Sequence, residues 1–332
     1  MKAVVIAAGS AEASIAASAA PSTAPNESLV RVRRVLLAAE DHLDFARRRG
    51  FTGVPGSLFG GVVEQSGARG PAVGARVVAE AAVPCGTCAA CRSGLSPACP
   101  DRTIAGLLGR DGALAELVAM PSAQLVELPE AVDDDRAVFA PLLGTGLLLE
   151  RRLGLGEAAF ITVIGRGVAP IAATLALRAR HPRARLLSDD PQTAAAAERL
   201  SLAHRPIGDA GRRRDQDAVV DFDATPRTIE TAIGMVRPRG QIAVAGNGWE
   251  SIDASLLRSL RHVEASLHGV GRGLAADGLP LLARRSIDPL PLLARRVGLE
   301  EAASWLGGGS PSDLDGTLAT IGSEPRAGGN PS

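Results

Sequence analysis

The stretch FITVIGRGVAP at residues 160–170 determines the expected fold. A run of buried-strand residues ends at a turn with two glycines, and the residues that follow have the composition of a helix. The order then repeats, since ARLLS (184–188), AVVDF (218–222) and QIAVAG (241–246) predict further strands with helical patterns between them. Strands separated by helices of this length predict a parallel sheet that is covered on both faces.

The turn has the context of a dinucleotide-binding fingerprint, because it follows a strand and opens a helix. Gly165 and Gly167 occupy the first two glycine positions and allow the backbone to approach a pyrophosphate closely. Pro170 stands at the third position, where a residue without a side chain normally packs the helix against the strand. Asp189 and Asp190 end the second strand, where an acid would hydrogen-bond the ribose of NAD and repel the 2′-phosphate of NADP. The alternative is a junction that binds nothing, with acids that only cap the next helix.

Residues 1–130 have a different pattern, in which short β-branched runs are bounded by glycine and proline. Around residue 133 the period changes, and DDDRAVFAPLLGTGLLLERRLG (133–154) predicts one apolar helix with acids at its start and arginines at its end. From residue 274 the chain is expected to be helical around two copies of LPLLARR. The strands expected before residue 130 are LVRVRRVLL (29–37), GGVVEQSG (60–67), ARVVAEAAV (75–83), DGALAELVAMP (111–121) and QLVELPE (124–130).

All four cysteines lie in CGTCAACRSGLSPAC, at Cys85, Cys88, Cys91 and Cys99. This C-x2-C-x2-C-x7-C spacing is suited to four thiolates around a single tetrahedral Zn²⁺. Four sulfur ligands leave no position for water or substrate, so such a zinc is structural. Two disulfides are the alternative. The N-terminus MKAVVIAAGSAEAS has no sustained apolar core that leads into a cleavage site, so we expect a cytoplasmic protein, in which disulfides are rare.

Composition narrows the class of protein. A chain of 332 residues is long enough for two domains. Its 36 basic and 36 acidic residues cancel, which favours neither a nucleic-acid partner nor a membrane surface. No apolar run is long enough to span a bilayer. Tyrosine is absent, which excludes reductases that depend on a tyrosine acid.

With these motifs the chain resembles the zinc-containing alcohol dehydrogenases of the medium-chain dehydrogenase/reductase superfamily. The resemblance runs from about residue 28 into the 270s, and more faintly to about 320. It implies an α/β fold, with a GroES-like β-rich catalytic domain that carries the structural zinc and a Rossmann domain for NAD(P). It also implies a second zinc that polarises the substrate oxygen, and a homodimer. The resemblance is strongest in GFTGVPGSLFGGVVE (50–64), the cysteine loop, CPDRTIAGLLGRDGALAELV (99–118) and DAVVDFDATPRTIETAIGMVRPRG (217–240).

The resemblance also sets the expected domain boundaries. They are a GroES-like domain at 1–132, a Rossmann domain at 133–272, a segment at 273–320 that returns to the catalytic domain, and a flexible Gly/Ser/Pro-rich tail at 321–332.

The residues aligned with the ligands of the second zinc are not ligands. Ala38 stands at the cysteine of the family's C-x-T-D motif, with Glu40 at the threonine and Asp41 at the aspartate. In the G-H-E motif, Ser57 and Leu58 replace the histidine and the glutamate. Alanine and leucine have no donor atom, and a serine hydroxyl is a poor zinc ligand.

The last ligand position leads to the same expectation, because Pro141 replaces the acid of the E-P motif. A rebuilt site from Glu40, Asp41 and His42 has ligand types, but adjacent residues on an extended segment point to opposite faces. A polar turn at the surface explains these three residues equally well. We therefore expect one structural zinc and no catalytic zinc.

Three interpretations of function remain open. The first is an NAD(P)-dependent oxidoreductase without a catalytic metal, with Glu40, Asp41 and Ser57 as candidate groups for holding the substrate oxygen. The second is a non-catalytic relative that binds a small molecule, a nucleotide or a protein. The third is a sequence that has drifted without function. The substrate cannot be inferred from the motifs.

Overall fold

The structure is a computed structural model that describes residues 1–8, 12–157, 159–211, 213–246, 248, 251, 253–308, 310, 313 and 315–321. The chain divides into two compact units. The first contains Met1–Val138 and the chain from Leu293 onward, and the second is Phe139–Leu292. The predicted boundaries at 133 and 273 thus differ from the observed ones at 139 and 293. The predicted flexible tail lies, from residue 322, outside the described residues.

The second unit is built on a parallel sheet with the strand order β13-β12-β11-β14-β15-β16. The chain enters at the centre, moves to one edge, and then crosses to the other side, which is the doubly wound Rossmann order. Every residue of β11 is buried, as a central strand covered on both faces requires. The predicted parallel sheet is confirmed. Its strands are β11 (Ile161–Ile164), β12 (Arg185–Leu187), β13 (His204–Arg205), β14 (Gln216–Asp221), β15 (Val236–Val244) and β16 (Ser266–Gly269).

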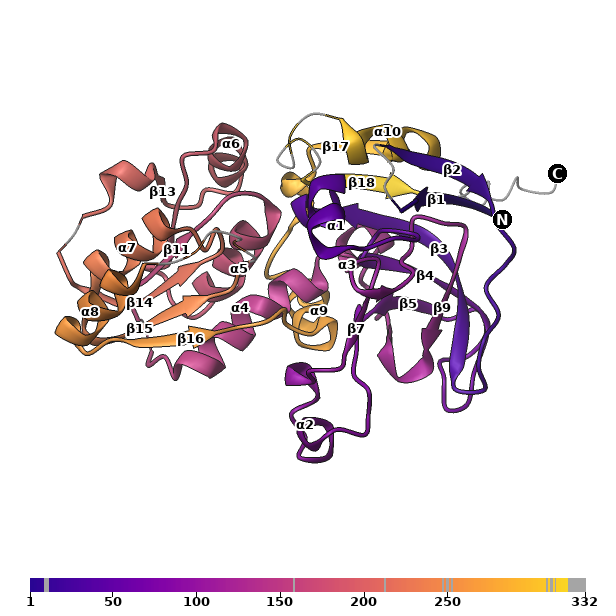
Figure 1. Ribbon diagram of the computed structural model, residues 1–332, viewed down its shortest axis with the longest axis horizontal. Coiled ribbons are helices and arrows are strands. Elements are labelled where there is room, and N and C mark those ends of the chain that lie inside the picture. Colours follow the sequence, from indigo (N-terminus) through magenta and orange to yellow (C-terminus); the bar gives the residue numbers. More distant parts are fainter. Residues whose placement is uncertain are drawn as a thin grey trace. The chain divides into compact units, whose positions relative to one another are not determined.

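Helices connect these strands and cover the sheet (Figure 1). One pair of helices, α7 (Pro226–Met235) and α8 (Ala254–Val263), packs together against β14 and β15. Another pair, α4 (Ala140–Leu153) and α5 (Val168–Arg178), packs together against β11, β12 and β15. Two further helices are α6 (Pro191–Arg199) and α9 (Ala275–Ala283).

The single helix predicted over residues 133–154 is two helices in the structure. α3 (Asp134–Ala137) ends before α4 begins at Ala140. Pro141 lies in the first turn of α4 and has no N–H to donate to the carbonyl of Ala137, so one continuous helix cannot pass through this point. Asp133 caps α3 by accepting from the N–H of Arg136 at 2.8 Å.

α9 lies in the second unit, although the sequence predicted that the chain returns to the first unit from residue 273. It packs against α4 at two glycines. A Cβ atom on Gly278 would lie 2.0 Å from the carbonyl oxygen of Ala140, and one on Gly144 would lie 2.1 Å from that of Leu274. Backbone therefore meets backbone at this contact, which fixes α9 to the second unit and moves the boundary beyond it.

The first unit is organised around β3 (Glu27–Leu37), which pairs with β4 (Leu58–Gln65), β9 (Leu117–Pro121) and β18 (Thr317–Thr320). β18 comes from the far end of the chain, so residues 317–320 complete the sheet of the first unit. The predicted strand 75–83 is divided into β5 and β6. The remaining strands are β1 (Lys2–Ile6), β2 (Ala13–Ala17), β5 (Arg76–Ala79), β6 (Ala82–Val83), β7 (Thr103–Ala105), β8 (Gly109–Arg110), β10 (Leu125–Glu127) and β17 (Arg295–Gly298), and the helices are α1 (Leu43–Arg49), α2 (Ala89–Arg92) and α10 (Leu299–Gly307).

The two copies of LPLLARR fold differently. The first copy, at 279–285, forms the end of α9. The second, at 290–296, contains a single 3₁₀ turn (Leu290–Leu292) and the start of β17, which pairs in parallel with β18. The helical expectation for the second copy is wrong, because pairing with β18 outweighs the local preference of the segment.

We expect the Gly278→Ala variant to lose about 1–3 kcal/mol of unfolding free energy, because the added methyl group must displace backbone of α4. Gly156→Ala is the matched control, since a Cβ atom there meets nothing within 4 Å. Urea unfolding of the two variants measures the difference. Equal stability of both would contradict the close contact between α4 and α9.

Candidate functional site

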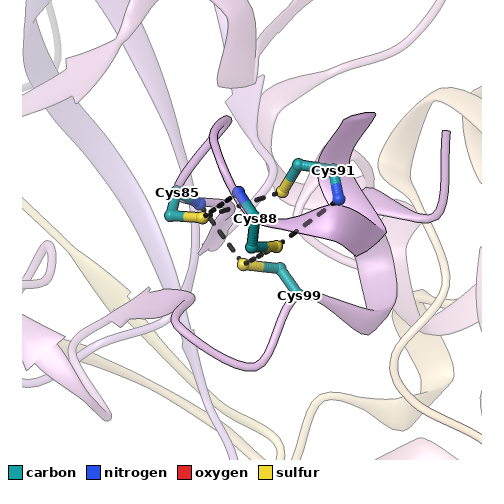
Figure 2. A group of neighbouring side chains, drawn as sticks. All are labelled: Cys85, Cys88, Cys91 and Cys99. Atoms are coloured by element: carbon teal, nitrogen blue, oxygen red, sulfur yellow. Dashed lines mark hydrogen bonds between the residues drawn. The ribbon is translucent and has the colours of Figure 1, made fainter. Parts of the chain in front are cut away.

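The four cysteines converge on one point of the first unit (Figure 2). Their Sγ atoms all lie within 4.8 Å of one another, although Cys85 and Cys99 are separated by a chain reversal. The Sγ atoms of Cys85 and Cys91 are 4.0 Å apart, and those of Cys88 and Cys99 are 3.8 Å apart. A disulfide requires a separation of about 2 Å, so the cysteines are free thiols in this structure.

The separations fit a tetrahedral zinc. Four sulfurs at about 2.3 Å from a central ion lie about 3.8 Å from one another. Backbone N–H groups also point at the sulfurs: Cys88 donates to Cys85 at 3.3 Å, Cys91 to Cys88 at 3.5 Å, and Cys85 to Cys99 at 3.4 Å. The N–H groups of Thr87 and Cys88 lower the pKa of the Cys85 thiol to about 6. The donor set is therefore suited to a closed four-thiolate site.

A buried carboxylate joins the two segments where the resemblance places lost zinc ligands. Asp41 ends the 3₁₀ turn Ala39–Asp41 and accepts from the N–H of Ala38 at 2.9 Å. The backbone N–H groups of Gly56 and Ser57 face the same carboxylate. Burial raises the pKa of Asp41 to about 6, although these N–H groups and the nearby Arg49 act in the opposite direction.

The residues expected at the ligand positions are buried but offer little to a metal. Ala38 is 8% exposed, while Ser57 and Leu58 are almost completely inaccessible. Pro141 is buried in the first turn of α4, in the second unit. The structure therefore gives these positions no side-chain donor beyond the Ser57 hydroxyl.

The rebuilt metal site at residues 40–42 does not form. The Nδ1 atom of His42 accepts from the N–H of Asp44 at 3.2 Å and so caps α1. Within the described residues, the four cysteines are the one group of three or more histidine, cysteine or acidic side chains close enough to share an ion. The alternative of a surface turn is also wrong, since Asp41 and His42 are 1% and 3% exposed.

The glycine-rich turn of the second unit has the backbone that the fingerprint requires. Gly165 follows β11 with φ +153°, and Gly167 has φ +89° at the start of α5. A Cβ atom on Gly165 would lie 2.7 Å from the Cβ atom of Phe222, so only glycine fits there. Pro170 lies inside the first turn of α5, where its missing N–H costs nothing.

Side chains of the protein already use hydrogen-bond donors of this turn. The N–H of Arg166 donates to Oδ1 of Asp223 at 3.2 Å, and the N–H of Gly167 donates to Oγ1 of Thr193 at 2.7 Å. The Thr193 hydroxyl in turn donates to Asp190 at 2.6 Å. The turn has the two positive-φ glycines of the fingerprint, while two of its N–H groups are engaged within the chain.

Both predicted ribose acids are engaged as well. One oxygen of Asp189 accepts from the N–H of Ile207 at 2.8 Å, and the other pairs with Arg227 at 2.9 Å. Asp190 caps α6, as the alternative interpretation expected. Asp189 remains 42% exposed at its side chain, so it can still face a ligand at the end of β12.

Sequence reasoning missed Asp223, Thr193 and Arg227. A signal for Asp223 was present, because it follows the strand AVVDF and the carboxyl ends of parallel strands meet at one edge of a sheet. Without the strand order, it was not visible that β14 is the direct neighbour of β11. Thr193 and Arg227 gave no signal, since they lie within the helices α6 and α7 rather than directly at the end of a strand.

A polar hollow of about 390 Å³ in the first unit lies apart from these residues. Its walls carry acids and arginines that pair with one another, including Asp134 with Arg76 and Asp135 with Arg34. It contains none of the candidate catalytic residues. Among the described residues, no helix is both long enough and apolar enough to cross a membrane.

Known proteins resemble the chain in both sequence and fold. The alcohol dehydrogenase GroES-like domain matches residues 24–130. A sorbitol dehydrogenase from Arabidopsis thaliana is 26% identical over 306 residues, which cover 85% of this chain and 84% of the relative. An L-threonine 3-dehydrogenase from Deinococcus radiodurans is 32% identical over 176 residues, which cover 50% of this chain and 49% of the relative.

Solved structures show the same fold at lower identity. A zinc-binding dehydrogenase from Sinorhizobium meliloti 1021, solved with NADP, superposes with a TM-score of 0.85 at 21% identity and covers 96% of this chain and 98% of its own. An alcohol dehydrogenase from Thermus sp. ATN1 gives a TM-score of 0.83 at 23% identity and covers 97% of this chain and 100% of its own.

The fold and the relatives define a dehydrogenase-like oxidoreductase with a GroES-like unit and a Rossmann unit. The matched GroES-like domain and these dehydrogenase relatives support a zinc-type alcohol dehydrogenase of the medium-chain dehydrogenase/reductase superfamily as the class to which the chain is similar.

The buried Asp41 gives the stability of the protein a defined pH dependence. Its pKa of about 6 in the folded protein exceeds its ordinary value of 3.8, so the folded state holds the proton more tightly and stability falls as pH rises through this window. Relative to Asp41→Asn, the wild-type protein should lose about 2 kcal/mol of unfolding free energy between pH 4.5 and pH 7.5.

Denaturant unfolding at the two pH values measures this difference. Glu127→Gln, which removes an exposed carboxylate at the end of β10, should leave the pH dependence unchanged. A constant difference between the wild-type protein and Asp41→Asn at both pH values would show that Asp41 titrates near its ordinary pKa.

Proposed function

We propose that the chain is an NAD(P)-dependent oxidoreductase of the alcohol dehydrogenase type that holds one structural zinc and no catalytic zinc. The observation that carries the proposal is the contrast within the first unit. Four thiols converge at separations suited to zinc, whereas Ala38 and Leu58 put no donor atom at the aligned ligand positions. Relatives named as sorbitol and L-threonine dehydrogenases support the alcohol–carbonyl chemistry.

The zinc in this proposal has a mechanical role. Cys85, Cys88, Cys91 and Cys99 would fill all four coordination positions, which leaves none for a substrate oxygen. The loop between β6 and β7 has little regular structure apart from α2 and the 3₁₀ turn Ser96–Ala98. The ion would therefore stabilise a loop that has little regular structure of its own.

The cofactor in this proposal binds at the turn after β11. Gly165 and Gly167 would face the pyrophosphate and Asp189 the ribose, and a bound nicotinamide would supply or accept the hydride. Without a Lewis acid, the substrate oxygen must be held by hydrogen bonds from the protein. Glu40, Asp41 and Ser57 are the candidate groups, and a carboxyl with a pKa of about 6 can be protonated near neutral pH.

A second function has an observation in its favour. Asp41 and Ser57 are almost completely buried, and N–H groups of the glycine turn are engaged with Asp223 and Thr193. Both features fit a non-catalytic relative in which these residues only maintain the fold. Such a protein would use the scaffold to bind a small molecule, a nucleotide or a partner protein.

Metal analysis tests the zinc assignment. The purified protein should contain one zinc per chain, and Cys99→Ser should lose it and unfold at a lower temperature, because the buried thiol of Cys99 has no substitute in the loop. Ser96→Ala, in the same loop, should retain the metal. Two zinc ions per chain in the wild-type protein would disprove the absence of a catalytic zinc.

Cofactor titration tests the hydride-transfer function, which requires NADH or NADPH to bind. Millimolar NADH should raise the melting temperature of the wild-type protein, because a ligand of the native state stabilises it. NADPH should raise it less, because the Asp189 carboxylate repels a 2′-phosphate. A larger shift with NADPH would disprove the role of Asp189. No shift with either nucleotide would eliminate hydride transfer and favour the non-catalytic relative.

A further inference from the structure

The start of α5 carries a negative charge that the protein itself supplies. The N–H of Arg166 donates to Oδ1 of Asp223 at 3.2 Å, and the Nε of Arg166 lies 3.5 Å from the same oxygen. The side chain of Asp223 is 13% exposed, so the protein largely encloses this contact. A carboxylate thus occupies the end of the helix that attracts anions.

Backbone contacts hold Asp223 in this position. Asp221, the last residue of β14, accepts from the N–H groups of Asp223 at 3.0 Å and Ala224 at 2.9 Å. The N–H of Phe222 donates to the carbonyl of Ile164 at 2.8 Å. The segment after β14 is therefore fastened to β11, whose carboxyl end leads into the glycine turn.

We propose that Asp223 is an internal competitor for the pyrophosphate of the dinucleotide and sets the affinity of the second unit for its cofactor. The inference rests on the proposed function, because it concerns the cofactor site at Gly165 and Gly167. The carboxylate engages an N–H group at the same turn and adds a charge of the same sign as the pyrophosphate. Cofactor binding therefore requires Asp223 to leave the turn or to tolerate a second anion beside it.

The other contacts of the turn do not have this effect. The hydroxyl of Thr193 is neutral, accepts from the N–H of Gly167 and donates to Asp190, so Asp190 reaches the turn only through this hydroxyl. The carboxylate of Asp189 lies at the end of β12 and pairs with Arg227. Among the acids described at this end of the sheet, Asp223 is the one that hydrogen-bonds to the turn between Gly165 and Gly167.

The test compares the wild-type protein with Asp223→Asn, whose amide oxygen can still accept from Arg166 but carries no charge. The dissociation constant for NADH should fall by about tenfold in the variant at fixed ionic strength, as measured by nucleotide fluorescence. Glu198→Gln removes an exposed acid from α6 in the same unit and should leave the dissociation constant unchanged.

A second measurement separates competition from a structural role. Without NADH, Asp223→Asn should melt at a lower temperature than the wild-type protein, because α5 loses a favourable charge at its start. A residue that only supports the fold would weaken both stability and NADH binding. If Asp223→Asn does not fold, Asp223→Ser keeps a short acceptor and is measured in its place.

The outcomes distinguish this inference from the proposed function. Tighter NADH binding by the uncharged variant, together with lower stability of the free protein, supports the inference. Equal or weaker binding by the variant overturns the inference, while the proposed function stands as long as the wild-type protein binds NADH. Failure of both proteins to bind NADH overturns both.

Discussion

The parallel pairing of β11 with β14 is the constraint on which the second unit depends. It places Ile164 opposite Asp221, so the turns that follow these two strands lie side by side. Gly165 has no room for a side chain because Phe222 fills the space, and Phe222 is held there by the carbonyl of Ile164. The strand order therefore determines which side chains can reach the start of α5, and it places an acid there.

Local sequence predicted the elements of this unit well, because β11 and α5 combine a buried apolar strand, two glycines and a helical pattern within a short stretch. The break between α3 and α4 was also within reach of the sequence, since Pro141 cannot donate to Ala137. The two copies of LPLLARR mark the limit of this approach. The first copy forms the end of α9, which packs against α4, whereas the second forms a 3₁₀ turn and the start of β17, which pairs with β18. The seven residues alone therefore do not determine the structure that they adopt.

The candidate sites also differ in how far the sequence could predict them. The cysteine cluster was predictable because its ligands lie within one loop, and the structure brings the four sulfurs to separations that suit zinc. At the positions aligned with the ligands of the second zinc, the sequence predicted only that metal-binding side chains are missing. The sequence did not predict the buried carboxylate found there, because Asp41 contacts Gly56 and Ser57 through the fold and not through neighbouring positions in the chain. A carboxylate that appeared to lie on a polar surface turn is instead the buried connection between two segments.

The loop that carries Asp223 is itself held by a titratable group. Burial raises the pKa of Asp221 to about 6, and the charge of Asp223 contributes in the same direction, although the N–H groups of Asp223 and Ala224 act against it. Both N–H groups donate to Oδ1 of Asp221, and an ionised carboxylate is the stronger acceptor. Protonation of Asp221 in mild acid therefore weakens the bonds that position Asp223. In the competition proposed for Asp223, this weakening would make the affinity for the nucleotide depend on the protonation of Asp221.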